Sequence, residues 1–240
     1  MKIANAGDRI MNTWLYPIGN GWVMIDTGYE SSYAKVRRRL AKLLIRPEEI
    51  RYLFLTHAHD DHAGFLNAWM NDHPHTQVVA APNALEGLCR GQNSFNGGCS
   101  SPLAYTFCQL MALFGKGEHR YPTLSEENLA RILTLRPENI SRIEATLNAK
   151  ILFTPGHTAD SVSLAVGGNV FCGDAAMNGL PSSHRITIWV EDKAEFERSW
   201  EQILESGAQR IYPAHGAPFP PGELAQNKHR ISGITLRPLK

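Results

Sequence analysis

Six consecutive residues, 57 to 62, read His-Ala-His-Asp-Asp-His and directly follow an apolar run. In an extended loop, side chains two residues apart share a face, so His57 and His59 can reach one point. Asp61 and His62 follow where the chain turns into a helix and can face a second, nearby point. Imidazole and carboxylate together favour zinc, iron, manganese or cobalt over calcium. The spacing therefore predicts a metal site in this loop.

Three later residues share one sequence context. His157 lies in "TPGH", Asp174 in "FCGD" and His215 in "YPAH". Each follows an apolar, strand-like run and sits in a turn of small residues. Because α/β sheets gather their sites at the C-terminal ends of strands, we expect these three side chains to complete the metal shell.

The elements that would position these residues alternate between strand and helix, which favours an α/β layered fold. Before residue 83 the pattern predicts a hairpin, a helix with Ser31 or Ser32 as its N-cap, a strand, a helix and a strand: 12–28, 31–44, 49–56, 62–73 and 76–82. After residue 147 it predicts three strands, a helix and a final strand: 150–157, 161–168, 169–176, 193–207 and 210–216.

Residues 83 to 146 break this rhythm, with a Gly-, Ser- and Asn-rich centre, an apolar helix near 102–114 and a second helical segment starting at Ser125. We expect a single domain over residues 1–240, with this stretch as a helical insertion. Two interpretations of the insertion remain open: an element packed on the core or at a dimer contact, or a mobile lid that lines an apolar pocket.

Composition excludes several classes of protein. A formal net charge of +1 gives no field that would favour nucleic acid or an anionic membrane. The first 20 residues lack an apolar segment long enough for a signal peptide or a membrane span. Four cysteines without a CxxC pair indicate reduced, small buried thiols and hence a cytoplasmic location.

The motif set resembles the metallo-β-lactamase-fold hydrolase superfamily. The similarity covers residues 10 to about 220, apart from the insertion, and includes the hairpin that ends in "IDTG". It implies a four-layer αββα sandwich and two divalent metal ions, most simply Zn²⁺, with Fe or Mn as alternatives. By this resemblance one ion takes His57, His59 and His157, the other takes Asp61, His62 and His215, and Asp174 bridges both.

The chemistry that such a centre implies is hydrolysis. Two divalent ions can hold a bridging hydroxide at neutral pH and polarise the oxygen under attack. Asp61 would be catalytic, because one carboxylate oxygen binds a metal while the other orients the nucleophile or relays its proton. We expect Asp60 and Asp26 to support the site rather than bind metal, and we expect His73, His75, His119 and His229 to be solvated.

Departures from known members narrow the substrate. In this superfamily true β-lactamases usually lack a carboxylate at the position of Asp174, and lactonases that open acyl-homoserine lactones typically carry a tyrosine where this chain has Met177. The aspartate thus argues against antibiotic hydrolysis, and the phenol typical of acyl-homoserine lactonases is absent. We expect a hydrolase of a small ester, lactone or thioester that resembles glyoxalase II enzymes or lactonases more than true β-lactamases. Expected substrate contacts are Met177, His184, Phe107 and Met111.

Two other activities are compatible with the same ligand set. One is a mononuclear iron oxygenase similar to persulfide dioxygenases, which would use only His57, His157 and Asp174. The other is a phosphodiesterase of the same fold. The expected partner is a small-molecule substrate, without nucleic acid or membrane, and a homodimer is compatible with the apolar helix of the insertion.

Overall fold

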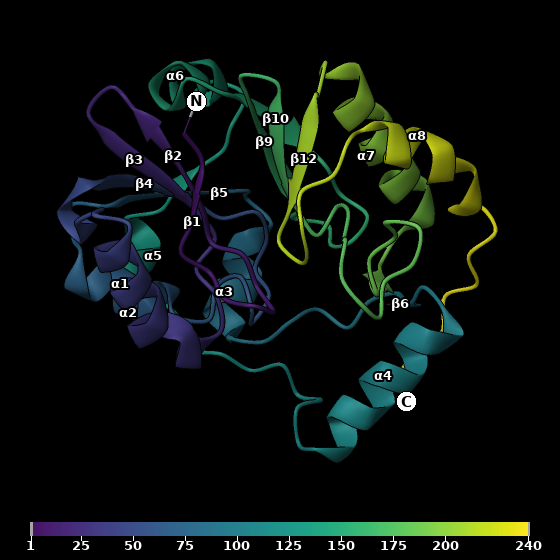
Figure 1. Ribbon diagram of the computed structural model, residues 1–240. Helices are drawn as coiled ribbons and strands as arrows, with labels where there is room; N and C mark the ends of the chain where they lie inside the picture. Colours follow the sequence, from purple (N-terminus) through teal and green to yellow (C-terminus); the bar gives the residue numbers. More distant parts are fainter. Residues whose placement is uncertain (1, 240) are drawn as a thin grey trace. The chain divides into compact units, whose positions relative to one another are not determined.

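Residues 2–239 are described by a computed structural model, in which the chain forms two compact units. Unit 1 takes the residues up to Asn93 together with Arg120–Lys150, and unit 2 takes Ser94–His119 together with the residues from Ile151 onward. The chain therefore leaves unit 1 for a short excursion and returns before it completes unit 2 (Figure 1). The expectation of a single domain over 1–240 stays a prediction.

Unit 1 is built on a six-stranded sheet of order β1-β2-β3-β4-β5-β7. The first three strands are antiparallel, and β3, β4, β5 and β7 run parallel to one another. The strands span Ala4–Asn5, Trp14–Ile18, Gly21–Ile25, Ile50–Phe54, Gln77–Ala80 and Leu133–Thr134. The parallel register places the loop after β4 at the C-terminal edge of the sheet.

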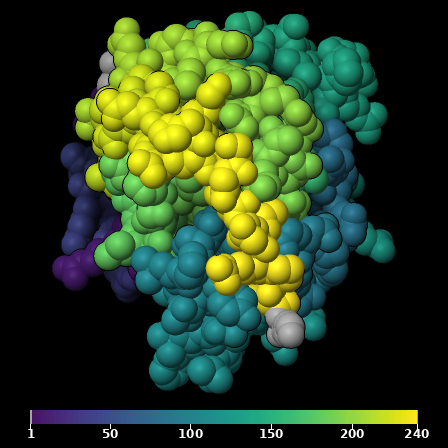
Figure 2. All heavy atoms as spheres, turned by 90° about the vertical axis from the view of Figure 1, so that its right-hand side faces the viewer, coloured from purple at the N-terminus to yellow at the C-terminus, as the bar shows by residue number. Residues whose placement is uncertain are grey.

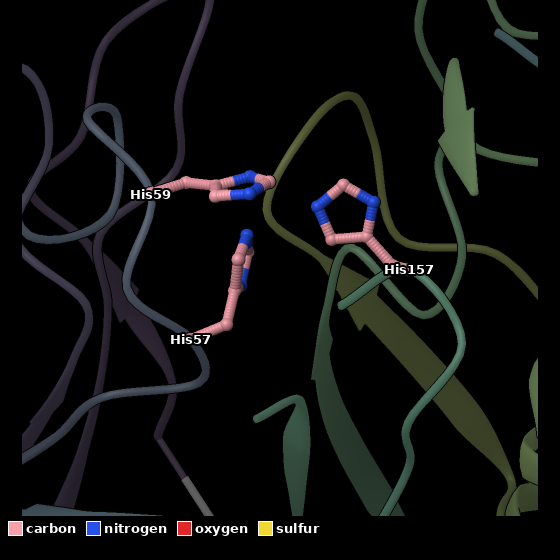
Figure 3. A group of neighbouring side chains, drawn as sticks. All are labelled: His57, His59 and His157. Carbon is pink, nitrogen blue, oxygen red and sulfur yellow. The ribbon is translucent and has the colours of Figure 1, made fainter. Parts of the chain in front are cut away.

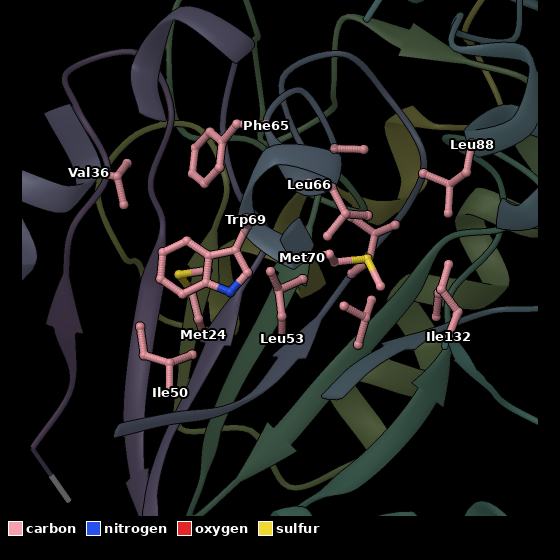
Figure 4. Packing of buried hydrophobic residues seen from close by; sticks show 14 of the residues in the cluster. Met24, Val36, Ile50, Leu53, Phe65, Leu66, Trp69, Met70, Leu88 and Ile132 are labelled. Carbon is pink, nitrogen blue, oxygen red and sulfur yellow. The ribbon is translucent and has the colours of Figure 1, made fainter. Parts of the chain in front are cut away.

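The helices of unit 1, apart from the last one along the chain, contribute apolar residues to the same core as this sheet. They are α1 (Tyr33–Lys42), α2 (Leu66–Asp72), α3 (Ala84–Arg90), α5 (Glu126–Ala130) and α6 (Ile140–Leu147). Short 3-10 turns cover Glu30–Ser32 and Pro47–Glu49. Figure 4 shows Trp69 of α2 packed among Met24, Ile50 and Leu53 of the strands, all fully buried. Burial of an aromatic side chain of this size contributes about 2–3 kcal/mol.

Unit 2 holds a four-stranded sheet of order β12-β10-β9-β8. The strands are β8 (Lys150–Phe153), β9 (Val162–Val166), β10 (Asn169–Gly173) and β12 (Arg210–Pro213). Strand β10 lies between antiparallel β9 and parallel β12, so β10 and β12 end at the same sheet edge. Helices α7 (Lys193–Glu205) and α8 (Gly222–Asn227) bury Phe196, Trp200 and Leu224 in this core, and a 3-10 turn, Lys228–Arg230, follows α8.

The excursion into unit 2 carries β6 (Gly98–Cys99) and α4 (Pro102–Leu113). Strand β6 pairs antiparallel with β11 (Trp189–Val190) and also with Arg237, through Cys99 N–Arg237 O at 2.9 Å and Arg237 N–Cys99 O at 3.0 Å. Figure 2 shows the C-terminal segment, in yellow, running over unit 2 toward the teal residues of this excursion. Segments near 99, 189 and 237 thus form one small sheet.

Most of the predicted elements are present, and the α/β class is confirmed. Ser32 is the N-cap of α1, one of the two predicted residues, although its side chain makes no capping hydrogen bond; Ser31 lies in the preceding 3-10 turn. One local prediction was wrong. The helix expected from residue 62 begins only at Leu66, because residues 59–63 form a tight turn. Residues 83–146 contribute to both units, and their strand β7 extends the first sheet. No helix within residues 2–239 combines the length and apolar character that a membrane span needs.

Candidate metal centre

The loop after β4 brings its four candidate ligands together. His57, His59 and His62 are buried, and the Asp61 side chain is 15% exposed. The ring centroids of His57 and His59 are 4.6 Å apart, and those of His57 and His62 are 3.9 Å apart. Asp61 Oδ1 lies 3.7 Å from His62 Nε2. These four residues are the unit 1 cluster; Figure 3 shows His57 and His59 leaving the same loop.

Hydrogen bonds from neighbouring segments fix the backbone of this loop. The Tyr121 hydroxyl donates to the carbonyl of Ala58 at 2.8 Å. Asn93 accepts from the Asp60 N–H at 2.7 Å and donates to Asp60 Oδ1 at 2.8 Å, which confirms that Asp60 supports the loop. Thr27 donates to the His62 carbonyl twice, from its N–H at 2.8 Å and from its hydroxyl at 2.7 Å. The loop is therefore held by its backbone, independently of any ligand.

The turn inside the loop requires a glycine. A Cβ on Gly64 would lie 2.4 Å from the Asp60 carbonyl oxygen, 2.5 Å from the Glu30 nitrogen and 2.6 Å from the Gly28 carbonyl oxygen. All three are backbone atoms, which cannot rotate away as a side chain can. The His62 and Ala63 N–H groups both donate to the His59 carbonyl, at 3.0 and 2.8 Å, and close the turn that carries the His62 ring onto His57.

Asp26 orients one of the histidines from behind. Its Oδ2 lies 2.8 Å from His62 Nδ1 and accepts a hydrogen bond from the Thr56 hydroxyl at 2.8 Å, while its Oδ1 accepts from the Thr56 N–H at 2.7 Å. A carboxylate at Nδ1 holds the proton there and leaves the Nε2 lone pair available. The supporting role predicted for Asp26 is confirmed. Asp26 has φ 58°, a sparsely populated conformation that is typical of residues under functional constraint.

Three separate loops present the candidate ligands of unit 2. His157 follows β8, Asp174 follows β10 and His215 follows β12. All three side chains are buried. His157 Nε2 lies 3.8 Å from Asp174 Oδ2, and His215 Nε2 lies 3.6 Å from Asp174 Oδ1, so each carboxylate oxygen faces a different histidine. These three residues are the unit 2 cluster, of which Figure 3 draws His157 on the loop after β8.

Tight turns position each of these loops. Gly156 has φ 125°, and a Cβ there would lie 2.3 Å from the Phe196 nitrogen of α7. Its carbonyl accepts from Glu191 N–H at 2.7 Å and Asp192 N–H at 3.0 Å. Gly216, after His215, has φ 90°, and a Cβ there would overlap the Asn178 carbonyl. Both glycines occupy left-handed conformations that other residues rarely adopt.

The tautomer of His157 is set by the backbone. His157 Nδ1 lies 2.8 Å from the carbonyl of Trp189, so the nitrogen donates to that oxygen and Nε2 keeps its lone pair. Trp189 is itself anchored, because its indole N–H donates to the Asn96 carbonyl at 2.8 Å. Sequence reasoning missed this carbonyl, because a backbone acceptor leaves no signature in residue type.

The donor set fits a divalent transition metal. It consists of buried imidazoles, the buried carboxylate of Asp174 and the partly exposed carboxylate of Asp61. His62 and His157 each have Nδ1 bound to an acceptor, which leaves Nε2 available for a metal. Histidine and aspartate groups in both units could therefore hold metal ions. Thr56 was also missed; its hydroxyl lies 3.1 Å from His57 Nδ1 and 3.2 Å from His62 Nδ1. The position of Thr56 directly before His57 in the sequence could have indicated this contact.

The remaining candidates lie in unit 2. Met177 is buried, and its N–H donates to the Arg185 carbonyl at 3.0 Å. His184 is exposed, with φ 56°. Phe107 and Met111 lie on α4, where Phe107 is 38% exposed and Met111 is half-buried. Contact of these four residues with a substrate stays a prediction.

Two expectations about other side chains were wrong. His73 is buried rather than solvated, since its ring packs on Trp69 with centroids 4.3 Å apart. Burial lowers the pKa of His73, and this effect outweighs the charge of neighbouring Asp72. Of the four cysteines, which are all free thiols, Cys99 and Cys172 are buried as expected, but Cys108 is half-buried and Cys89 is exposed because its side of α3 faces solvent.

Comparison with known proteins identifies the family. The sequence profile of the metallo-beta-lactamase superfamily matches residues 6–215. The chain therefore belongs to the metallo-β-lactamase superfamily, which confirms the resemblance of its motifs. A curated relative is the beta-lactamase-like protein 2 homolog of Drosophila melanogaster, 28% identical over 208 residues. That match covers 85% of this chain and 58% of the relative, so the chain spans little more than half of the relative's length.

Solved structures confirm the fold. A B3 metallo-β-lactamase with an active-site glutamic acid is similar with a TM-score of 0.64 and 19% identity, over 96% of this chain and 86% of that one. A metallo-β-lactamase superfamily protein from Sulfolobus tokodaii gives 0.62 and 15%, over 92% and 80%. The metallo-β-lactamase FIM-1 from Pseudomonas aeruginosa, in its mono-zinc form, gives 0.59 and 18%, over 93% and 84%. At these identities the likeness establishes the predicted metallo-β-lactamase fold and nothing finer.

Proposed function

We propose that the unit 1 and unit 2 clusters together form one binuclear metal centre that hydrolyses a small ester, lactone or thioester. One ion would be held by His57, His59 and His157, and the other by Asp61, His62 and His215. Asp174 would bridge them. The observation that carries this proposal is the Asp174 carboxylate, whose two oxygens face two different histidines at 3.8 and 3.6 Å.

Bound divalent ions supply a water of lowered pKa and a Lewis acid that polarises the substrate carbonyl. The protein's own side chains and backbone would accept the proton and orient the histidine ligands. Asp61 is the most exposed member of its cluster, and the carboxylate oxygen that does not bind metal would accept a hydrogen bond from the attacking water and take up its proton. The negative charge of Asp26 at His62 Nδ1 strengthens that imidazole as a ligand, and the Trp189 carbonyl holds the His157 ring in one orientation.

The substrate class follows from charge and from the residues that are present. A net charge of +1 supplies no field for a polyanion. A carboxylate at Asp174 differs from the usual β-lactamase ligand, and Met177 offers a thioether where related lactonases place a phenol. Zinc is the proposed metal, and the free cysteines support a cytoplasmic location. A small neutral or weakly anionic acyl compound fits these features.

The test joins metal analysis to a substrate screen. Protein purified without added metal would be assayed for zinc, iron and manganese per chain by mass spectrometry. It would then be screened with ester, lactone, thioester, phosphodiester and β-lactam substrates. The proposal expects about two ions per chain and acyl hydrolysis, with both lost after chelation and regained with zinc. The number of metal ions per chain must be measured, because a similar β-lactamase exists in a mono-zinc form.

Other outcomes would replace the proposal. One iron per chain with oxygen uptake on a persulfide would assign the oxygenase chemistry. Turnover confined to phosphodiesters would assign a phosphodiesterase. A chain that binds no transition metal under any of these conditions would end the metal-hydrolase proposal altogether.

A further inference from the structure

Helix α4 carries an apolar face that its own unit leaves exposed. Five large apolar side chains on and directly after this helix are between 38% and 84% exposed: Leu103, Phe107, Leu110, Leu113 and Phe114. Phe95, just before β6, is exposed by 46%. Figure 1 shows α4 extending from β6 away from α7 and α8. Large apolar side chains that stay exposed together on one helix indicate an interaction site.

The spacing of these residues is that of a helix-packing seam. Leu103, Phe107, Leu110 and Phe114 follow one another at intervals of four, three and four residues. This alternation keeps apolar side chains in one stripe along a helix and is the pattern by which two helices interlock. We call these four residues the α4 seam. The natural counterpart of the seam is another helix with the same spacing.

The opposite side of α4 is already occupied. Ala104 is fully buried, and it packs with Cys99 and Trp189 in a small core that Tyr105 and Cys108 also contact. The helix start is fixed, because Ser101 Oγ accepts from the Ala104 N–H at 3.1 Å and Pro102 occupies the first turn. Helix α4 is thus held firmly on unit 2 by one side while the seam faces outward.

Charge and area indicate what covers the seam. The twelve residues of α4, PLAYTFCQLMAL, include no charged side chain, so a charged partner would find no complement there. A membrane-surface helix carries Lys or Arg on its polar face, which α4 lacks. The five exposed side chains and Phe95 present roughly 600 Å² of apolar surface, close to the ~800 Å² per partner of a stable interface.

We propose that the α4 seam is a homodimer interface, in which α4 of one copy packs on α4 of a second copy about a two-fold axis. A two-fold contact places the same patch on both sides, so an uncharged apolar face is complementary to itself. Phe107 lies near the middle of the helix and would approach its own counterpart. The proposal is independent of the metal centre, and it gives Phe107 a partner other than substrate.

Sedimentation velocity of the full chain between about 1 and about 100 μM tests the interface. Wild type is expected to be a dimer. The double variant Phe107→Glu/Leu110→Glu is expected to be a folded monomer, with dimer affinity weakened by at least about 100-fold because like charges meet across the axis. Leu44→Glu is the matched control, since Leu44 is 89% exposed in unit 1 and lies outside the seam; it should remain a dimer.

A charge-exchange experiment makes the partner explicit. Phe107→Lys/Leu110→Lys alone should also be monomeric, whereas an equimolar mixture with the Glu double variant should form heterodimers. Circular dichroism confirms that each variant is folded. A monomeric wild type at about 100 μM, a dimeric Glu double variant, or a mixture that stays monomeric would each overturn the proposal. So would a monomeric wild type that co-sediments with phosphatidylcholine vesicles, which would assign the seam to a lipid surface.

Discussion

The two units position their candidate metal ligands in opposite ways. Unit 1 places four candidate ligands in one loop of six residues, 57–62, which neighbouring segments hold by its backbone. Unit 2 gathers three candidate ligands from loops after three different strands, each with its own tight turn or its own backbone contacts. The first cluster depends on one local structure, whereas the second depends on the order and register of a sheet. A single defect should therefore disable all of the unit 1 cluster but only one member of the unit 2 cluster.

The units also differ in how they orient a ligand. In unit 1 a side-chain carboxylate, Asp26, fixes His62, and Asp26 can be changed by substitution. In unit 2 a main-chain carbonyl, that of Trp189, fixes His157, and no side-chain substitution removes it. Metal affinity should therefore be more sensitive to substitution of Asp26 in unit 1 than to substitution of Trp189 in unit 2.

The largest expected effect is on turnover through Asp61. Asp61→Asn keeps the shape of the side chain but removes the oxygen that takes up the proton, so kcat should fall by about 10²–10⁴. Steady-state kinetics on the best substrate of the screen measures it. Asp60→Asn is the matched control, because Asp60 is bound to Asn93 and is not a proposed ligand. Equal losses in both variants would contradict a proton-transfer role for Asp61.

The next effect separates the clusters by metal count. Gly64→Ala drives a methyl group against three backbone atoms and should displace the whole loop, so we expect almost no bound metal. Gly156→Ala displaces only the His157 turn and should leave about one ion per chain. Mass spectrometry of metal content decides. Gly222→Ala is the control, because its new methyl group has open space around it, and it should bind as many metal ions as wild type. If Gly64→Ala and Gly156→Ala lost equal amounts of metal, the proposed difference between the two clusters would be wrong.

A smaller effect, on metal affinity, is expected from substituting the residues that orient the candidate histidine ligands. Asp26→Asn removes the charge at His62 Nδ1 and should weaken metal affinity by about 10–100-fold, measured by competition with a chelator. Trp189→Phe keeps the carbonyl that binds His157 and should change affinity by less than about threefold, although it loses the indole hydrogen bond to Asn96. If Asp26→Asn left metal affinity unchanged, the two units would not differ in their dependence on a side chain that orients a histidine.

The smallest effect concerns acid stability of unit 1. Because burial lowers the pKa of His73, the unfolded chain binds a proton that the folded chain resists, so stability falls as pH drops below about 6.5 toward the folded pKa. In chelator-treated protein, His73→Gln should lose less melting temperature than wild type between about pH 7 and about pH 5. His75→Gln, at the exposed neighbour, should behave as wild type. If the melting temperatures of all three proteins depended on pH in the same way, protonation of His73 would not be the cause of the loss of stability in acid.

The sequence indicated where the candidate ligands would gather, because His and Asp residues are concentrated at a few positions; their binding of metal stays a prediction. Five His and Asp residues within the six positions 57–62 are typical of a metal site, and His157, Asp174 and His215 each follow a strand that the structure contains. The internal geometry was harder to predict. An extended loop would pair His57 with His59, yet the turn at His59 brings the His62 ring closer to His57, at 3.9 against 4.6 Å.

Contacts that cross long stretches of sequence could not be predicted. Asn93 lies 33 residues from Asp60, and Tyr121 lies 63 residues from Ala58, so no local pattern links them. His73 looked solvated because "NDHPH" is a polar turn, but its ring continues the buried side of α2 through Trp69. The strand β7 was hidden inside residues 83–146 because two residues are too few to show a periodic pattern.

The pairing of β6 with Trp189, Val190 and Arg237 has a consequence for synthesis on the ribosome. Cys99 emerges long before any of its strand partners, and at about 5–20 residues per second the edge of β6 waits on the order of ten seconds for the C-terminal segment. During that interval the nascent chain displays an unfinished strand edge beside the apolar surface of α4. Chaperone capture of stalled chains should therefore concentrate between residues 94 and 119 until residue 237 has been translated.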